Sequence, residues 1–150
     1  MTCSFRATRR VEFRDTDAAG IAHFSCFFHY MEEVEHAFLR HLGLSVVMSD
    51  EQGTMSWPRV AATCQYQGAV RFEDVLDIAL RVANLGSSSI TYGFRFTHQG
   101  RQIAEGEIVA VCCRMEPGQS PRAIPIPAHV AERLAEARDR QAAQPAGDAE

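Results

Sequence analysis

The chain has 150 residues, 46% of them hydrophobic, so it is long enough for one domain with a sizeable core. Its formal net charge of -4, with no basic block and no zinc-finger spacing, argues against a partner made of nucleic acid. It has no secretory signal pattern and no apolar run near the roughly 20 residues that span a bilayer, so we expect a cytoplasmic protein without a membrane span.

The cysteines are odd in number and form no CxxC pair. Most of them lie inside apolar segments, as buried reduced thiols do. We therefore expect neither a disulfide framework nor a metal site among Cys3, Cys26, Cys64, Cys112 and Cys113.

A strand and a long helix are the first predicted elements. Apolar and polar side chains alternate over residues 5–13, which predicts a half-buried strand with Val11 and Phe13 on its inner side. Between Phe24 and Leu42, apolar residues recur every three or four positions, which predicts a helix of about 18 residues. Gly43 is expected to end this helix in a Schellman motif.

The rest of the chain predicts four strands and a short helix. Residues 45–56 are interpreted as a connection, and strands are expected over 59–66, 75–82, 89–98 and 102–114. Their period-two alternation places Val60, Ala62, Cys64 and Tyr66 on the inner side of the first of these strands. Glu105 and Glu107 interrupt the last strand, which indicates a bulge or a wet face. A helix is expected over 128–140.

The order of elements points to one α+β architecture. A long apolar helix followed by long antiparallel strands is best buried when a curved five-stranded sheet wraps around that helix, which is the hotdog fold. We expect residues 1–140 to form this single domain and residues 141–150 to be a flexible tail. An exposed edge strand in such a sheet favours a homodimer.

The loop RDTDAAGIAHF, residues 14–24, carries the strongest chemical signal. Asp15 and Asp17 fit two interpretations, either turn residues that bond to nearby backbone or carboxylates that act on a substrate. The small residues after them, ending in Gly20, leave room for a ligand to approach the backbone closely.

The predicted helix start adds a second possible function for this loop. The first amide groups of a helix have no partner within it, so an amide near Phe24 can bind an oxyanion. Ser25 is a candidate N-cap residue. His23 fits either a structural hydrogen bond or a role in orienting substrate or water. Phe27 and Phe28 fit either the core or an acyl pocket.

The first third of the chain resembles the opening of the 4-hydroxybenzoyl-CoA thioesterase family, whose members are hotdog acyl-CoA thioesterases. The resemblance is seen in the segment VEFRDTDAAGIAHFSCFFHYMEEVEHAFLRHLGLS. The likeness continues in WPRVAATCQYQGAVRFEDVLDIALRV and GSSSITYGFRF. It implies hydrolysis of an acyl-CoA thioester with Asp17 as nucleophile or general base and the Phe24 amide polarising the carbonyl. It also implies no cofactor and a homodimer or homotetramer with the active site at a subunit interface.

The chain departs from the family where some relatives bind the phosphates of CoA with basic residues, because Gly86, Ser87 and Ser88 stand there. The CoA contact is then expected from Ser87, Ser88 and Ser89 or from Arg71, although Arg59 and Arg71 also fit solvated surface charges. The position of His23 is occupied by an aromatic residue in some family members.

Two other functions compete with the thioesterase. A hotdog hydratase or dehydratase also uses an acid and a histidine, but in D-x-N-P-x-H these are five residues apart, whereas Asp17 and His23 are six apart. A non-catalytic module that binds acyl-CoA or acyl carrier protein is the other possibility, and the presence of Asp17 argues against it.

Overall fold

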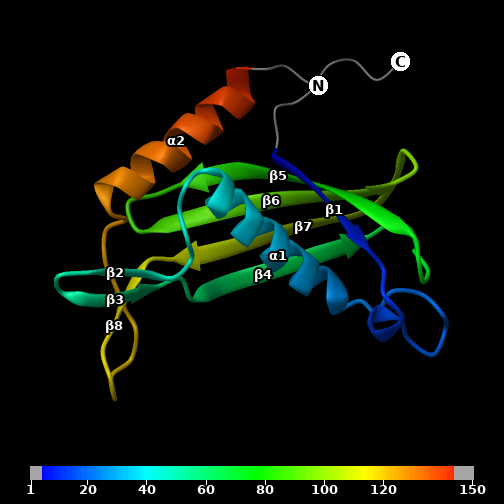
Figure 1. Ribbon diagram of the computed structural model, residues 1–150, viewed down its shortest axis with the longest axis horizontal. Helices are drawn as coiled ribbons and strands as arrows, with labels where there is room; N and C mark the ends of the chain where they lie inside the picture. The colour runs from blue at the N-terminus through cyan, green and yellow to red at the C-terminus, as the bar shows by residue number, and fades with distance from the viewer. Residues whose placement is uncertain (1–4, 144–150) are drawn as a thin grey trace.

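The computed structural model describes residues 5–143, which form two antiparallel sheets and two α-helices. In the larger sheet five strands lie in the order β1-β5-β6-β7-β4, and helix α1 crosses one face of it (Figure 1). These strands are β1 (Phe5–Arg10), β4 (Arg59–Tyr66), β5 (Val75–Leu85), β6 (Ser89–His98) and β7 (Arg101–Val111). The predicted α+β class is confirmed.

Strands β5 and β6 supply most of the inner face of this sheet. Their apolar side chains alternate with exposed polar ones such as Asp77 and Arg81, because successive residues of a strand point to opposite faces. The buried set is Leu76, Ile78, Leu80, Val82, Ile90, Tyr92, Phe94 and Phe96. On the outer face, Arg95 forms an ion pair with Glu105 at 3.5 Å, so the acidic positions of β7 belong to a wet face.

Strand β4 departs from the predicted burial. Ala62, Cys64 and Tyr66 pair with Ile108, Gly106 and Ala104 of β7 and so lie on the predicted inner face, whereas Val60 lies at a register shift. Ala62 and Tyr66 are nevertheless exposed. The reason is position, since β4 is an edge strand that pairs only with β7. Sequence alternation reports a side chain's face, but an edge strand without a covering layer leaves both faces open.

Helix α1 (Cys26–His41) has 16 residues and begins after Phe24, which is exposed. Gly106 in β7 lets the helix lie close to the sheet, because a Cβ atom at this glycine would collide with the sulfur of Met31. The helix ends in the predicted Schellman motif. There Gly43, with φ 72°, donates to the Arg40 carbonyl at 2.9 Å and Leu44 donates to that of Leu39 at 2.8 Å.

A second sheet occupies segments that were predicted as a connection and as the end of a longer strand. It contains β2 (Met48–Asp50), β3 (Gly53–Ser56), β8 (Cys113–Met115) and β9 (Arg122–Ala123). The predicted strand 102–114 divides at Cys112, whose amide donates to the Ser88 carbonyl at 2.7 Å. Arg114 then holds β8 to the β2–β3 hairpin by donating to both carboxylate oxygens of Asp50, at 2.7 and 2.9 Å.

The C-terminal helix α2 (Ala128–Ala143) starts where it was predicted but is as long as α1, with 16 residues. It packs against β5 (Figure 1). Gln141 accepts a hydrogen bond from the Val82 amide at 2.9 Å and donates to the Leu80 carbonyl at 3.3 Å. Residues 141–143, which were predicted as part of the tail, therefore belong to the helix, and residues 144–150 lie outside the described part.

Among the described cysteines all four thiols are free: Cys26, Cys64, Cys112 and Cys113. The last two are buried, whereas Cys3 lies outside residues 5–143. Neither α1 nor α2 is both long and apolar enough to cross a membrane.

Candidate active site

The loop between β1 and α1 starts with a turn that ends the strand earlier than predicted. β1 stops at Arg10, and residues Phe13–Asp15 form a short 3-10 helix, η1, whose side chain at Phe13 is exposed instead of inward-facing. The Asp15 carboxylate accepts a hydrogen bond from the Glu12 amide at 2.9 Å, which stabilises this turn. The local hydrogen bond therefore outweighs the apolar alternation at Phe13.

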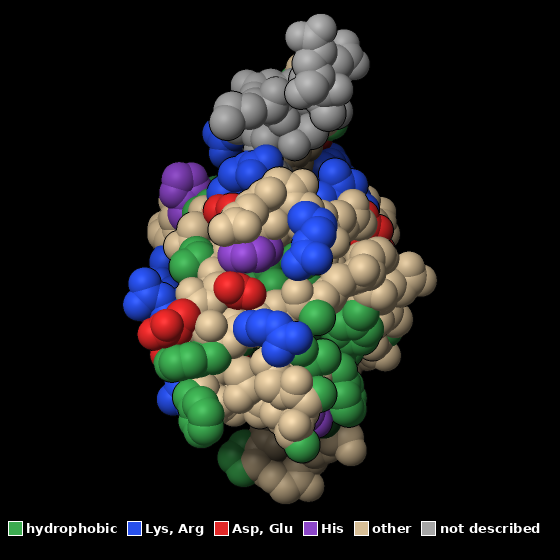
Figure 2. Space-filling model, turned by 90° about the vertical axis from the view of Figure 1, so that its right-hand side faces the viewer, with side chains coloured by type: hydrophobic (Ala, Val, Ile, Leu, Met, Phe, Trp, Pro, Cys, Tyr) green, Lys and Arg blue, Asp and Glu red, His purple; other side chains and the backbone are tan. Residues whose placement is uncertain are grey.

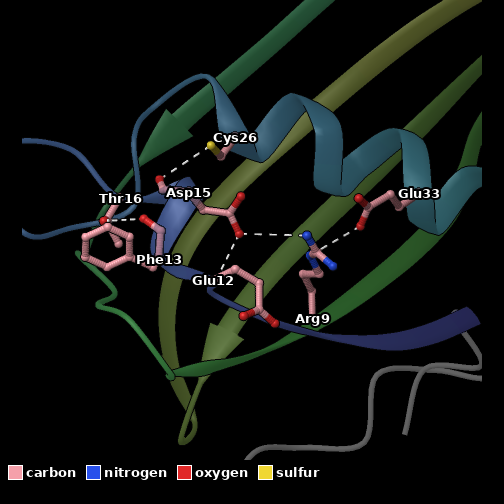
Figure 3. Close-up of polar contacts among 7 residues, drawn as sticks. All are labelled: Arg9, Glu12, Phe13, Asp15, Thr16, Cys26 and Glu33. Atoms are coloured by element: carbon pink, nitrogen blue, oxygen red, sulfur yellow. Dashed lines mark hydrogen bonds and ion pairs between the residues drawn. The ribbon is translucent and has the colours of Figure 1, made fainter.

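Asp15 faces the interior of the protein and is only 7% exposed (Figure 3). Its carboxylate lies 3.8 Å from the Arg9 guanidinium, which also pairs with Glu33 at 3.4 Å. Its carbonyl accepts a 3.5 Å hydrogen bond from the thiol of Cys26, at the start of α1. These contacts join β1, the loop and the helix. Of the two aspartates, Asp15 is therefore the structural one.

Asp17 lies on a tight turn that orients its carboxylate. Its amide donates to the Ile21 carbonyl at 2.9 Å, and Gly20 donates to the Asp17 carbonyl at the same distance with φ at 77°. One carboxylate oxygen accepts from the amides of Ala19 at 2.8 Å and Ile21 at 3.4 Å. Asp17 is thus a turn residue, as one interpretation predicted, and its second carboxylate oxygen makes no hydrogen bond to the described residues.

A cavity of about 160 Å³ adjoins this carboxylate. Its walls are mainly apolar and come from the loop, from α1 and from the segment after β4. They include Phe24, Phe27, Tyr66 and Val70. Phe27 is both a buried core residue and part of the cavity wall, whereas Phe28 packs against the core.

Tyr66 is a component of this cavity that the sequence did not single out. Its hydroxyl donates to the Phe24 carbonyl at 2.8 Å and so ties β4 to the entry of α1. Burial raises the pKa of Tyr66 to about 12, with smaller contributions from Cys64, so its hydroxyl keeps its proton at neutral pH. The one sequence signal was its place at the end of a predicted strand.

The Phe24 amide is a free donor beside the cavity. Within residues 5–143 it makes no hydrogen bond, although both of its neighbours, His23 and Ser25, donate theirs. The Phe24 side chain is 63% exposed at the cavity rim. An unpaired backbone N–H at an open cavity can donate a hydrogen bond to the oxygen of a bound carbonyl group.

His23 provides the cap of α1 that was expected from Ser25. The His23 carbonyl accepts from the Cys26 amide at 3.0 Å, and its Nδ1 accepts from the Ser25 amide at 3.3 Å. The Ser25 hydroxyl lies 2.7 Å from the same Nδ1 and makes no cap hydrogen bond to the helix. The His23 ring stacks on Phe24 with centroids 4.4 Å apart and does not line the Asp17 cavity.

Arg71 lies beside the loop, whereas the three predicted serine contacts do not. Ile21 and Arg71 form a β-bridge, and one Arg71 guanidinium nitrogen is 3.5 Å from where a Cβ atom on Gly20 would lie. Residues 87–89 lie at the other end of β6, about 30 Å away along a ten-residue strand. There Ser87 and Ser88 accept hydrogen bonds from Ile126 and Cys112, so one chain alone does not bring these serines to Asp17.

Within residues 5–143, no three His, Cys, Asp or Glu side chains are grouped as ligands of a metal ion. The groups at the cavity that can act on a substrate are the Asp17 carboxylate, the unpaired Phe24 amide and the Tyr66 hydroxyl.

Comparison with known proteins identifies the family. A sequence profile described as the thioesterase-like superfamily matches residues 11–134. The chain belongs to this superfamily. A putative esterase of Aquifex aeolicus is 31% identical over 84% of this chain and 94% of its own length. An acyl-CoA thioester hydrolase of Escherichia coli O157:H7 is 27% identical over 82% of this chain and 94% of its own length.

Solved structures agree with this membership of the thioesterase-like superfamily. A gentisyl-coenzyme A thioesterase superposes with a TM-score of 0.75 at 30% identity, covering 87% of this chain and 99% of that one. The hotdog fold, the resemblance to hotdog thioesterases and the thioester hydrolase class are confirmed.

Proposed function

We propose that this member of the thioesterase-like superfamily hydrolyses an acyl-CoA thioester to a free carboxylic acid and CoA, with Asp17 as the catalytic carboxylate. The observation that carries the proposal is a single cavity that holds an oriented carboxylate beside apolar walls and a free amide. The apolar walls suit an acyl group. The names of the relatives support CoA as the thiol carrier.

Two mechanisms fit Asp17. As a nucleophile, its carboxylate attacks the thioester carbonyl carbon, the C–S bond breaks, CoA leaves as the thiolate, and water then hydrolyses the mixed anhydride. As a general base, Asp17 takes a proton from a water molecule that attacks the same carbon, after which the C–S bond breaks and CoA leaves as the thiolate. The two hydrogen bonds to its first carboxylate oxygen leave the second oxygen for either step.

The Phe24 amide is proposed as the group that polarises the thioester carbonyl. A preorganised N–H donor is most effective where negative charge develops on an oxygen atom, and removal of such a donor typically costs about a hundredfold or more in rate. Because His23 caps the helix and stacks on Phe24, we assign it the positioning of this amide rather than proton transfer. Gly20, with φ at 77°, allows the turn that orients the Asp17 carboxylate.

A homodimer or homotetramer is the assembly that we propose. The long edge strand β4 leaves a row of backbone groups unpaired within the described chain, and a second copy can pair with it. Ser87, Ser88 and Ser89 remain predicted CoA contacts that would need a second copy of the chain to meet the site. We also predict that the protein is cytoplasmic and that it needs no cofactor.

A thiol-release screen tests the proposed function. Purified protein is incubated with benzoyl-, hydroxybenzoyl-, short-, medium- and long-chain acyl-CoAs, and free CoA is measured with a thiol reagent. We expect release from at least one class of substrate. Hydration of an enoyl-CoA without thiol release would instead identify a hydratase, and tight binding without any turnover would identify a non-catalytic module.

A further inference from the structure

A second cavity, of about 380 Å³, lies beside the proposed active site and is lined by Arg71, His98 and Arg101 together with Asp74. It is formed by the segment after β4 and by the turn between β6 and β7. The end of the molecule with this turn faces the viewer in Figure 2, where basic, acidic and His side chains lie together on the surface. We call this second cavity the cationic cavity.

The only acid that lines the cationic cavity is already engaged. Asp74 accepts a hydrogen bond from the Arg71 amide at 2.8 Å, and its other oxygen lies 3.7 Å from His98 Nε2. The other ring nitrogen of His98 is 2.9 Å from the Val75 carbonyl, which fixes the ring. Asp74 therefore holds the backbone and the histidine in place instead of neutralising the arginines.

Both guanidinium groups keep donors for a ligand. Within residues 5–143, neither Arg71 nor Arg101 forms an ion pair with a carboxylate. Arg101 donates one hydrogen bond, to the Ala69 carbonyl at 3.2 Å. A guanidinium group has five N–H donors in a planar fork that matches phosphate oxygens, so two of them around one cavity suit a phosphate or a diphosphate.

The cationic cavity adjoins the cavity that contains Asp17, because Ala69 lines both of them. Arg71 also lies against Gly20, the residue at the end of the Asp17 turn. A substrate that places its reacting carbon at Asp17 can therefore extend past Ala69 into the cationic cavity. Under the proposed function, the part of the substrate that carries phosphate is the CoA leaving group.

We propose that the cationic cavity binds phosphate groups of CoA through Arg71 and Arg101, while His98 and Asp74 fix the shape of its wall. This inference rests on the proposed function, and it adds Arg101 to the substrate-binding residues. It places a CoA contact on the chain that supplies Asp17, at the opposite end of β6 from Ser87 to Ser89.

Steady-state kinetics with two matched substrates test the assignment. Arg101→Gln and Arg71→Gln are each assayed with an acyl-CoA and with the acyl-pantetheine thioester, which has the same acyl group and no phosphate. We expect KM for acyl-CoA to rise about tenfold to a hundredfold, as loss of a hydrogen bond to a charged group predicts, with kcat within twofold. KM for acyl-pantetheine stays unchanged. Arg122→Gln, at an exposed arginine in β9, is the control that leaves both values unchanged.

Calorimetric titration with free CoA and with pantetheine keeps the test independent of turnover. Even if the protein hydrolyses neither thioester, CoA should bind the wild type more tightly than it binds the Arg101→Gln variant. An equal rise in KM for both substrates, or unchanged CoA binding in both variants, would overturn the assignment.

Discussion

Asp15 and Asp17 are separated by a single residue, yet they lie in opposite surroundings. Asp15 is buried, accepts a backbone hydrogen bond and faces the Arg9 guanidinium. Asp17 lies at a cavity, with one of its oxygens held by two amides. The difference shows that a D-x-D spacing does not itself assign a function, because the turn at residues 13–15 decides which carboxylate faces inward.

Replacing Asp17 with Asn is the change with the largest expected effect on activity. The amide oxygen can still accept from Ala19 and Ile21, so the turn survives, but neither a nucleophilic carboxylate nor a general base remains. We expect kcat for thiol release to fall about a hundredfold or more. The melting temperature, measured in parallel, should stay within about 2 °C of the wild type, a change well below 1 kcal/mol. Turnover within threefold of the wild type would remove Asp17 from the mechanism.

Replacing Asp15 with Ala should show the reverse pattern. It leaves the Glu12 amide without its acceptor and removes a carboxylate from Arg9. We expect the free energy of unfolding to fall by about 2 kcal/mol, measured by urea denaturation. Turnover per folded molecule should fall by less than tenfold. If the variant is as stable as the wild type but inactive, the roles assigned to the two aspartates are exchanged.

A third carboxylate, Glu35, lies in the middle of α1 and is buried in the helix–sheet interface, away from the turn and the cavity that hold the two aspartates. It is 1% exposed, and one of its oxygens lies 2.7 Å from an Arg59 guanidinium nitrogen. Burial raises the pKa of Glu35 to about 7, with Arg59 opposing the shift. Desolvation therefore outweighs the charge of its partner.

The raised pKa predicts how stability depends on pH. Below about pH 4.5, the carboxyl is protonated in both the folded and the unfolded state. As the pH rises towards about 7, the unfolded state releases this proton while the folded state retains it, so the free energy of unfolding falls, by an amount on the order of 2 kcal/mol. Urea denaturation at pH 5 and pH 8 should show this fall in the wild type and a clearly smaller one in Glu35→Gln. An identical fall in both proteins would contradict the assignment.

The smallest expected effect comes from His23. Replacement with Ala removes the Nδ1 acceptor of the Ser25 amide at the start of α1. We expect a loss of about 0.5 to 1 kcal/mol in unfolding free energy, as for other helix caps, and a fall in kcat of less than tenfold. His23→Asn is the matched control, because its side-chain oxygen can accept the same hydrogen bond and should restore stability. A hundredfold loss of kcat in both variants would show a chemical role for His23.

The sequence predicted best the elements whose side chains meet the core on a regular period. Strand β6 has the predicted bounds, and α1 ends at Gly43 as expected, because alternation and the glycine cap are local signals. The second sheet was missed because its short strands depend on a partner distant in the chain, as in the pairing of Arg114 with Asp50.

The part of the site formed by the loop between β1 and α1 could be predicted from the sequence, but the residues that line the rest of the site could not. Asp17, Gly20 and the helix start are neighbours in sequence, so their proximity followed from a single turn. Tyr66 and Arg71 approach that turn from a distant segment, and only the folded chain shows this. Alternation predicted the face of Tyr66 but not its exposure, since an edge strand is incompletely covered within the described chain.

Gln141, at the end of α2, covers part of the edge of β5 and so bears on the solubility of the protein. By occupying the Val82 amide and the Leu80 carbonyl, its side chain takes the place of a neighbouring strand along part of β5. Unoccupied groups on a strand edge are a template for pairing with other molecules. A chain shortened to residue 140 would expose this stretch of β5 and is expected to self-associate, so the last turn of the helix protects the sheet from aggregation.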